Sequence, residues 1–163
     1  MAIVLIIVLV LITCFTVVLL FGAPYLPTLS PQIETALDLA DLKAGDTILE
    51  LGCGDGRVLI SAAKRGLNVV GYELNPILAL IAWVRTRRFH GQVKVVWGDF
   101  WRKSWPRTDA IFVFLLTKYM SKLNKKCIQY PHKPLKLVSF AFAIPGRKPE
   151  ALERGVYLYL YDK

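Results

Sequence analysis

The segment ILELGCGDGRVLI, residues 48–60, constrains the fold more than any other part of this chain. Three glycines alternate in it at Gly52, Gly54 and Gly56, an acid precedes them at Glu50, and apolar residues lie on both sides. A short apolar run, a glycine-rich turn and a second apolar run predict a buried strand, a tight turn and a helix. In parallel sheets built from such units, ligands bind at the carboxyl ends of the strands.

The rest of the chain alternates between strand and helix patterns. We expect helices at 32–42, 58–64, 76–89 and 118–130, and strands at 47–52, 68–73, 93–97, 109–116, 135–144 and 156–161. Apolar strands that alternate with helices predict an α/β fold with a doubly wound, mostly parallel sheet. Residues 145–155 resemble a loop that is too short for a parallel crossover, so we expect the last two strands to form an antiparallel hairpin.

The N-terminal segment differs in composition from the rest. Residues 2–21 carry no charge, and 16 of these 20 are Ile, Val, Leu or Phe. A helix of this length spans about 30 Å, the thickness of the hydrocarbon core of a bilayer. A cleaved signal peptide is the alternative, but no basic residue precedes the run and Pro24 disfavours cleavage after Ala23. We therefore predict one transmembrane helix at 1–22, a proline-rich linker and helix at 23–46, and a compact domain at 47–163.

Charge is confined to the part of the chain that follows this segment. All 21 Lys and Arg and all 12 Asp and Glu come after it, and the net charge is +9. This favours a single-pass membrane protein whose domain faces the cytosol, and anionic lipid as a partner. The basic stretch 118–126 and the arginines at 85–88 keep nucleic acid open as a less favoured partner. The three cysteines have no metal-ligand spacing, so no metal is predicted.

The acids near the glycine turn indicate which ligand it binds. Glu50 and Asp55 would repel a pyrophosphate in the same turn, and neither the G-x-G-x-x-G fingerprint nor a P-loop is present. Glu73 ends the second strand, where a carboxylate can bind ribose hydroxyls, and Asp99 follows the third, where an acid can meet an adenine amino group. S-adenosylmethionine combines a cationic methionine portion with adenosine and has no phosphate, so it is the predicted cofactor.

Several stretches resemble one family closely. ELGCGDGR, GYELNP and GDF resemble the first three motifs of class I S-adenosylmethionine-dependent methyltransferases, which have a Rossmann-like sheet. APYLPTLSP, LELGCGDGRVLISAA and SFAFAIPGRKP further resemble the membrane-anchored lysine methyltransferases of the ATP synthase c-subunit and adenine nucleotide translocase in mitochondria, and their prokaryotic relatives. The chain departs from the family in its short length and in FVFLLTKYM, which replaces the usual sequence beside the acceptor.

The resemblance implies a set of site residues. It places residues 25–28 across the methionine end of the cofactor as a lid, with a rigid membrane linker as the alternative. From the chemistry of methyl transfer rather than from the resemblance, Thr28 and Tyr119 are the candidates for orienting the acceptor amine, and a structural role is the alternative for each. The predicted cofactor-binding residues are Tyr25, Pro27, Thr28, Glu50, Gly52, Cys53, Gly54, Asp55, Gly56, Arg57, Glu73, Leu74, Asn75, Asp99 and Phe100.

The predicted reaction is methyl transfer to a lysine of a membrane or membrane-proximal protein. A nucleic-acid amino methyltransferase would carry Asn/Asp-Pro-Pro-Tyr/Phe after the fourth strand, but this chain has LTKYM at 116–120. Transfer to nucleic acid, lipid or a small molecule, and a non-catalytic cofactor-binding scaffold, are the alternatives. Binding of oligonucleotides that weakens with salt would favour the nucleic-acid alternative.

Overall fold

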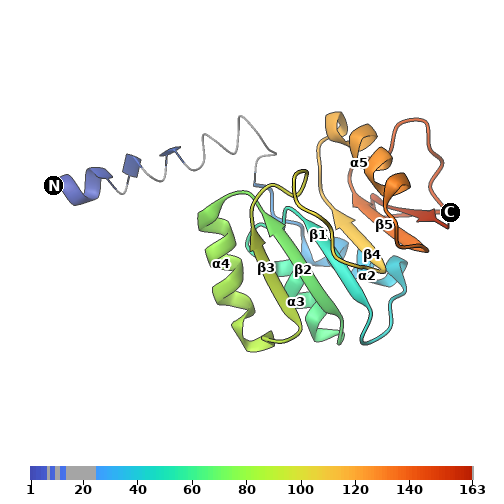
Figure 1. Ribbon diagram of the computed structural model, residues 1–163, viewed down its shortest axis with the longest axis horizontal. Coiled ribbons are helices and arrows are strands. Elements are labelled where there is room, and N and C mark those ends of the chain that lie inside the picture. Colours follow the sequence, from blue (N-terminus) through green and yellow to red (C-terminus); the bar gives the residue numbers. More distant parts are fainter. Residues whose placement is uncertain (7, 10–11, 14–24, 163) are drawn as a thin grey trace.

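The computed structural model describes residues 1–6, 8–9, 12–13 and 25–162. From residue 25 onward it is a single α/β unit (Figure 1), with elements in the order α2 (Ser30–Ala40), β1 (Thr47–Leu51), α3 (Arg57–Lys64), β2 (Asn68–Glu73), α4 (Pro76–Thr86), the 3-10 helix η1 (Arg87–Phe89), β3 (Val93–Trp97), β4 (Ala110–Val113), α5 (Thr117–Gln129), β5 (Leu135–Phe140), β6 (Ala151–Glu153) and β7 (Val156–Tyr161).

These strands form one seven-stranded mixed sheet in the order β3-β2-β1-β4-β5-β7-β6. The strands from β1 to β5 pair in parallel, whereas β7 is antiparallel to both β5 and β6. The strand order reverses between β1 and β4, and this reversal opens a crevice where ligands bind in doubly wound sheets. The predicted α/β fold is therefore confirmed.

Helices cover both faces of the sheet because its strands are apolar on both sides. Ile48 of β1 packs with α2, α3 and Ala82 of α4 in one buried cluster. Leu49, its neighbour in the strand, packs with Met120 and Leu123 of α5 in a second cluster on the opposite face. Side chains alternate along a strand, so consecutive apolar residues supply two cores at once.

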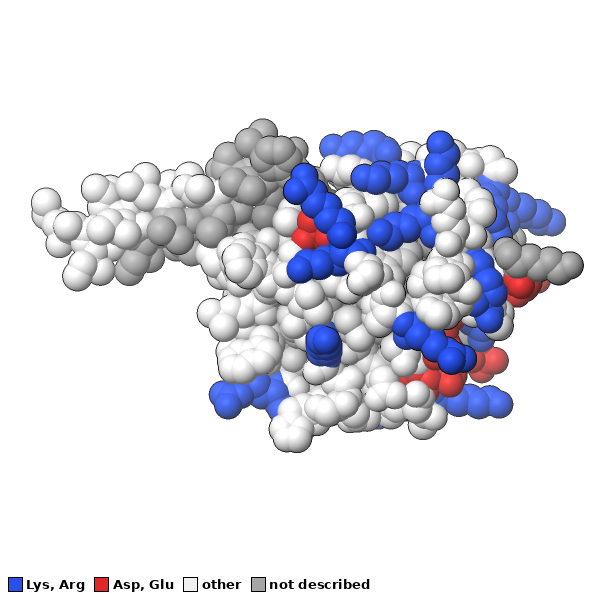
Figure 2. Space-filling view, in the orientation of Figure 1, with Lys and Arg blue, Asp and Glu red and all other residues white. Residues whose placement is uncertain are grey.

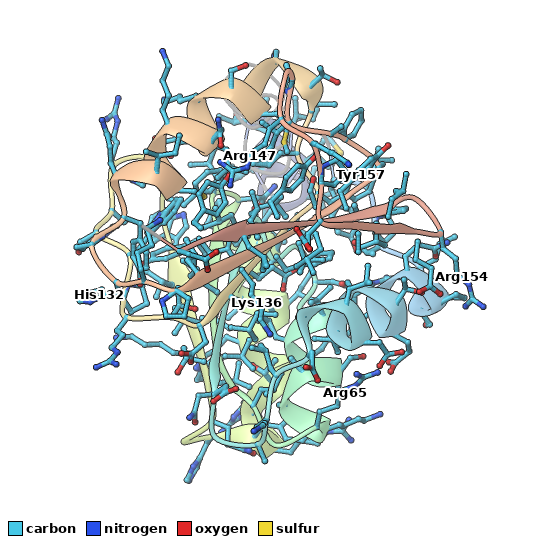
Figure 3. The ribbon with its side chains drawn as sticks, turned by 90° about the vertical axis from the view of Figure 1, so that its right-hand side faces the viewer. Arg65, His132, Lys136, Arg147, Arg154 and Tyr157 are labelled. Atoms are coloured by element: carbon cyan, nitrogen blue, oxygen red, sulfur yellow. The ribbon has the colours of Figure 1, made fainter. Side chains whose placement is uncertain are left out.

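Helix α2 belongs to the first of these layers. Ile33, Ala36, Leu37 and Ala40 of α2 are all buried. At its C-terminal end, the ammonium of Lys136 of β5, which is labelled in Figure 3, donates hydrogen bonds to the carbonyl oxygens of Ala40 (2.6 Å) and Asp41 (3.1 Å). A cation at the negative end of a helix stabilises it, so α2 is joined both to the core and to the sheet.

Some predicted boundaries differ from the structure. The predicted antiparallel pairing of 135–144 with 156–161 is confirmed by the register of β5 and β7. The loop predicted for 145–155 is wrong at Ala151–Glu153, which forms the edge strand β6. The strand predicted for 109–116 ends at Val113, because the next three apolar residues leave the sheet and line a cavity.

Among the residues that the structure describes, no helix is both long and apolar enough to cross a membrane. Residues 7, 10–11 and 14–22 of the predicted transmembrane helix lie outside the described residues. The transmembrane helix therefore stays a prediction.

Candidate functional site

A cavity lies at the carboxyl ends of β1, β2 and β4, where the strand order reverses. Thirteen of the fifteen predicted cofactor-binding residues line it, as do both predicted acceptor-orienting residues, Thr28 and Tyr119. The two exceptions are Gly56, which follows the turn as the N-cap of α3, and Asn75, which is fully buried. The predicted residues that line the cavity are Tyr25, Pro27, Thr28, Glu50, Gly52, Cys53, Gly54, Asp55, Arg57, Glu73, Leu74, Asp99 and Phe100.

The glycine turn is held against β2 by backbone hydrogen bonds. The amides of Gly52 and Cys53 both donate to the carbonyl oxygen of Tyr72, each at 2.9 Å. Gly54 has φ +53°, and a Cβ on it would lie 2.8 Å from the ring of Tyr25. The turn therefore needs glycine at this position both for its left-handed backbone and for the close approach of Tyr25.

Glu73 fixes the turn from the end of β2. One carboxylate oxygen accepts from the Gly54 amide and the other from the Asn75 amide, each at 2.8 Å. Burial raises the pKa of Glu73, while these backbone hydrogen bonds act in the opposite direction. Asn75 in turn caps α4, because its Oδ1 accepts from the amides of Ile77 and Leu78. Asn75 thus contributes by positioning Glu73 and α4 and does not itself line the cavity.

Glu50 is the one acid here that the described residues leave without compensation. It lies in the middle of the sheet at the end of β1, is buried, and its Oε2 has no hydrogen-bond partner. Burial raises the pKa of Glu50 well above its ordinary value, and the charges of Glu73 and Asp55 raise it further. An unpaired buried carboxylate is unfavourable, so this position is suited to a ligand that brings a cationic or hydrogen-bond-donating group.

Asp55 does not act as the free negative charge that the sequence argument assumed. Its carboxylate accepts from Arg57 Nε at 3.0 Å and Nη2 at 2.9 Å, and it also forms an ion pair with Arg85 of α4. Burial raises the pKa of Asp55, but the two guanidinium groups outweigh burial and hold the pKa below its ordinary value. Of the two acids in this segment, only Glu50 has a buried carboxylate oxygen without a hydrogen-bond partner. The spacing of residues in the sequence does not predict that Arg85, thirty residues later, is the ion-pair partner of Asp55.

Arg57 joins the turn to the segment before α2. Its Nη1 donates to the carbonyl oxygen of Thr28 at 3.3 Å, and the guanidinium also pairs with Asp55. Tyr25 packs on Gly54 from the same segment, and Thr28 is buried. Residues 25–28 therefore lie over the glycine turn, where a lid was predicted.

Asp99 lies on the far side of the cavity, after β3. Its Oδ1 accepts from the Trp101 amide at 2.8 Å, which closes a tight turn, and Arg102 lies 3.6 Å from its other oxygen. The Phe100 and Trp101 rings that follow are 4.7 Å apart. An acid and an aromatic pair at this position can bind the edge and the face of a base.

One wall of the cavity is apolar and was not predicted from the sequence. Two of its rings, Phe114 and Phe142, stack with their centroids 6.1 Å apart, and Trp101 lies 6.2 Å from Tyr119. The signal was the length of the apolar run at 109–116, which exceeds what β4 uses. The missed residues that line the cavity are Leu51, Val58, Leu78, Trp101, Phe114, Leu115, Leu116 and Phe142; Leu26 also lines it and lies within the predicted lid at 25–28.

The cavity combines a buried carboxylate, a glycine turn and an apolar wall. Within the described part of the chain, no group of His, Cys, Asp and Glu side chains could hold a metal ion. The sequence model of the ANTKMT methyltransferase domain matches residues 50–151, which include the turn, Glu73, Asp99 and the wall. This chain belongs to the ANTKMT methyltransferase domain family.

Two curated relatives and one solved structure match this chain over most of its length. It is 30% identical to the human ATP synthase c-subunit lysine N-methyltransferase over 129 residues, 78% of this chain and 55% of that protein. It is 31% identical to the protein-lysine N-methyltransferase of Saccharolobus islandicus over 150 residues, 84% of this chain and 92% of that protein. A crystal structure described as an RNA methyltransferase from Salinibacter ruber with S-adenosyl-L-homocysteine superposes with a TM-score of 0.79 at 26% identity, covering 85% and 95% of the two chains.

The methyltransferases named for the ATP synthase c-subunit are longer proteins. This chain spans 52–59% of the length of the four vertebrate relatives that it matches. The archaeal relative is matched over 92% of its length.

Proposed function

We propose that this chain uses S-adenosylmethionine to methylate a lysine side chain of a membrane or membrane-proximal protein. One observation carries the cofactor: the buried, unpartnered Glu50 oxygen beside a glycine turn at the sheet reversal. S-adenosylmethionine supplies an electrophilic methyl group on a sulfonium when it is bound. Glu50 and the turn are suited to its cationic methionine portion, Glu73 to the ribose, and Asp99 with Phe100 to the adenine.

The protein must bind the acceptor lysine with its amine in the neutral form. A lysine with the ordinary pKa of about 10.4 must lose a proton before it attacks, at a cost of about 4 kcal/mol near neutral pH. The attacking nitrogen gains the methyl group, the carbon–sulfur bond breaks, and S-adenosylhomocysteine leaves. An apolar entrance walled by Phe114, Leu116 and Phe142 would exclude water and depress the pKa of the amine, so no strong base is required.

Thr28 and Tyr119 are the residues we propose for orienting that amine. Both line the cavity, and they come from distant parts of the sequence: Thr28 from the segment over the turn and Tyr119 from the first turn of α5. A hydroxyl can accept a hydrogen bond from the amine and hold its lone pair toward the methyl group. The names of the human and archaeal relatives, both lysine N-methyltransferases, support the choice of lysine.

Methyl transfer to RNA is the second candidate. The Salinibacter ruber structure supports it by its name, and α5 supports it by its charge. Lys and Arg gather on the surface over α5 in Figure 2. Lys122 of this helix lies over the Trp101 ring at 4.3 Å, and Lys126 lies over the Trp105 ring at 4.6 Å. Cations beside aromatic rings are typical of protein surfaces that bind nucleic acid.

One experiment separates these acceptors. The purified full chain is incubated with tritium-labelled S-adenosylmethionine and membranes and RNA of its own host, and the product is treated with protease, nuclease or organic solvent. The proposal predicts label that protease releases and nuclease leaves intact. Label released by nuclease would establish the second candidate, and label extracted by solvent would identify a lipid acceptor. Cofactor binding without labelled product would indicate a non-catalytic scaffold.

We also propose that residues 1–22 anchor the chain as a single transmembrane helix, followed by the linker and helix at 23–46 and the domain at 47–163, which faces the cytosol. The uncharged residues 2–21 and the position of every Lys and Arg after them support this. The anchor predicts that the chain stays with host membranes in alkaline carbonate. Release into the carbonate supernatant would contradict it, and protection of the domain from protease in intact cells is expected only for a cytosolic domain.

A further inference from the structure

Helix α4 has an apolar surface that is exposed and is not covered by the other parts of the domain that the structure describes. Its sequence, PILALIAWVRT, carries no charge before Arg85. Leu78, Ala79 and Ala82 face the core, and a helix this apolar is normally buried all round. The opposite side is exposed instead, together with a tryptophan on the adjacent edge strand β3. The residues of this α4 surface are Leu80, Ile81, Trp83, Val84 and Trp97.

The α4 surface lies at the edge of the domain and includes two exposed tryptophans. Trp97 is 65% exposed and Trp83 is 51% exposed, although tryptophan is among the residues that contribute most when buried. Figure 1 places α4 at the outer edge of the sheet, and in Figure 2 this edge is almost free of charged atoms apart from a basic group at one end. An apolar surface of this kind marks an interaction site.

Basic residues border the α4 surface at one end. Arg85, Arg87 and Arg88 follow directly on the apolar stretch, and the Arg87 guanidinium lies 5.1 Å from the Trp83 ring. Tryptophan beside arginine, next to aliphatic side chains, is the composition of segments that lie in the headgroup region of a bilayer. The net charge of +9 would add attraction to anionic lipids.

The α4 surface is also tied to the point where the uncharged N-terminal segment joins the domain. Residues 2–21 lead to Tyr25, which packs on Gly54, and Thr28 accepts from Arg57. Arg57 pairs with Asp55, and Arg85 of α4 donates to the Asp55 carbonyl oxygen at 3.0 Å and pairs with its carboxylate. One short chain of bonds thus fixes the end of α4 relative to the start of the domain.

We propose that the α4 surface lies in the headgroup region of the bilayer, so that the domain is held against the membrane at a second point. This rests on the proposed anchor, which would bring the surface within reach of lipid. A domain attached by its linker alone could turn freely. Two points of attachment would instead hold the cavity at a constant height and orientation above the membrane, which suits an acceptor lysine close to the bilayer.

Quenching by brominated lipids tests the proposal, because bromine placed near the top of the acyl chains quenches tryptophans that lie at the boundary between the headgroups and the acyl chains. The full chain is reconstituted in vesicles of anionic brominated phospholipid, and flotation first measures whether it binds them. The four tryptophans divide into two pairs: Trp83 and Trp97 on the α4 surface, and Trp101 and Trp105 near the cavity and α5. We expect the double variant Trp83→Phe/Trp97→Phe to lose most of the quenching, and Trp101→Phe/Trp105→Phe to retain it.

A charged substitution provides the matched control. Val84 on α4 and Ile128 on α5 are almost equally exposed, at 52% and 51%, and neither lines the cavity. Val84→Glu should abolish the quenching of Trp83 and Trp97 while flotation is retained, and Ile128→Glu should change neither. A chain that floats with Trp83 and Trp97 unquenched would overturn the proposal and leave the anchor standing. A chain that does not float would overturn both, and the methyltransferase assay in detergent would still report on the proposed reaction.

Discussion

Glu50 is a residue whose buried charge disfavours folding but would favour the binding of a cationic ligand. Its carboxylate is buried with one unpartnered oxygen, and Glu73 and Asp55 are negative neighbours. Since the folded state raises the pKa of Glu50, folding takes up a proton between the ordinary value of 4.5 and the raised value. The contribution of the Glu50 carboxyl to the free energy of unfolding therefore falls as the pH rises from the ordinary pKa to the raised pKa. The unfavourable charge is what a cationic ligand would relieve.

We predict that Glu50→Gln stabilises the cofactor-free protein at neutral pH. The expected gain is about 1.4 kcal/mol for each pH unit that separates the folded and unfolded pKa values of the carboxyl. The gain should shrink as pH falls toward 4.5, where the wild-type carboxyl becomes protonated in both states. Urea unfolding at several pH values measures it, and calorimetry should show weaker binding of S-adenosylmethionine by the same variant.

An exposed acid serves as the control for this change. Glu150 is exposed and does not line the cavity, so Glu150→Gln should leave both quantities unchanged. A Glu50→Gln protein that is less stable than wild type at neutral pH, or that binds the cofactor equally well, would contradict the role given to Glu50.

Arg57 is a second single residue that matters for the site, because it joins the start of α3 to Asp55 and to Thr28. Its forked guanidinium bonds both Asp55 oxygens and the Thr28 carbonyl oxygen, which a lysine cannot do at once. We predict that Arg57→Lys weakens binding of S-adenosylhomocysteine about threefold to tenfold, with the lower part of the range reflecting a partly exposed guanidinium. Titration calorimetry measures the change in Kd.

Arg65 offers a matched control for Arg57. It bonds two acids in the same forked way, Glu34 and Asp38 of α2, on a part of the surface away from the cavity (Figure 3). Arg65→Lys should therefore lower stability slightly and leave Kd unchanged. Equal loss of binding in both variants would show that Arg57 acts through general stability alone.

At the scale of elements, residues 25–28 contact the glycine turn and line the cavity, which is where we predict a lid. A methyl group on Gly54 would meet the Tyr25 ring at 2.8 Å, and its φ of +53° disfavours any side chain. We predict that Gly54→Ala destabilises the fold by about 1 kcal/mol through the backbone and weakens cofactor binding further by displacing Tyr25. Thermal unfolding and calorimetry separate the two effects.

Two companion variants make this test specific. Tyr25→Ala in the Gly54→Ala background should leave the backbone cost of about 1 kcal/mol unchanged, because it removes only the ring that the new methyl group meets. Gly45→Ala has a left-handed φ of +95° with no atom within 4 Å, so it should lower stability without changing binding. If Gly54→Ala binds the cofactor as wild type does, residues 25–28 do not form a functional lid.

The elements differ in how far the sequence predicts them. β2, β3 and β7 match their predicted bounds, because turn residues mark both of their ends. β6 was missed because Ala151–Glu153 has only three residues, of types that favour helix, and pairing with β7 alone makes it a strand. The predicted strand 109–116 was too long because apolar character serves two purposes there, first a buried strand and then a cavity wall.

At the scale of the whole molecule, the sequence predicts the acids and glycines of the site but not its closure. Glu50, Glu73 and Asp99 each lie at or just after the end of a strand, and the parallel sheet brings strand ends to one edge, so their convergence was predictable. The pairing of Asp55 with Arg85 and the approach of Phe142 to Phe114 depend on how α4 and the β5–β6 connection pack. Such contacts between distant segments leave no periodic signal in a single sequence.

We propose that methyl groups are transferred to protein lysine in this cavity. The most direct test is amino-acid analysis of hydrolysed protein from host membranes after reaction with labelled S-adenosylmethionine, with wild type and Glu73→Ala in parallel. We expect labelled methyllysine with wild type and none with Glu73→Ala, because that variant loses the carboxylate that holds the Gly54 and Asn75 amides. Label in any other residue, or equal methyllysine with both proteins, would contradict the account.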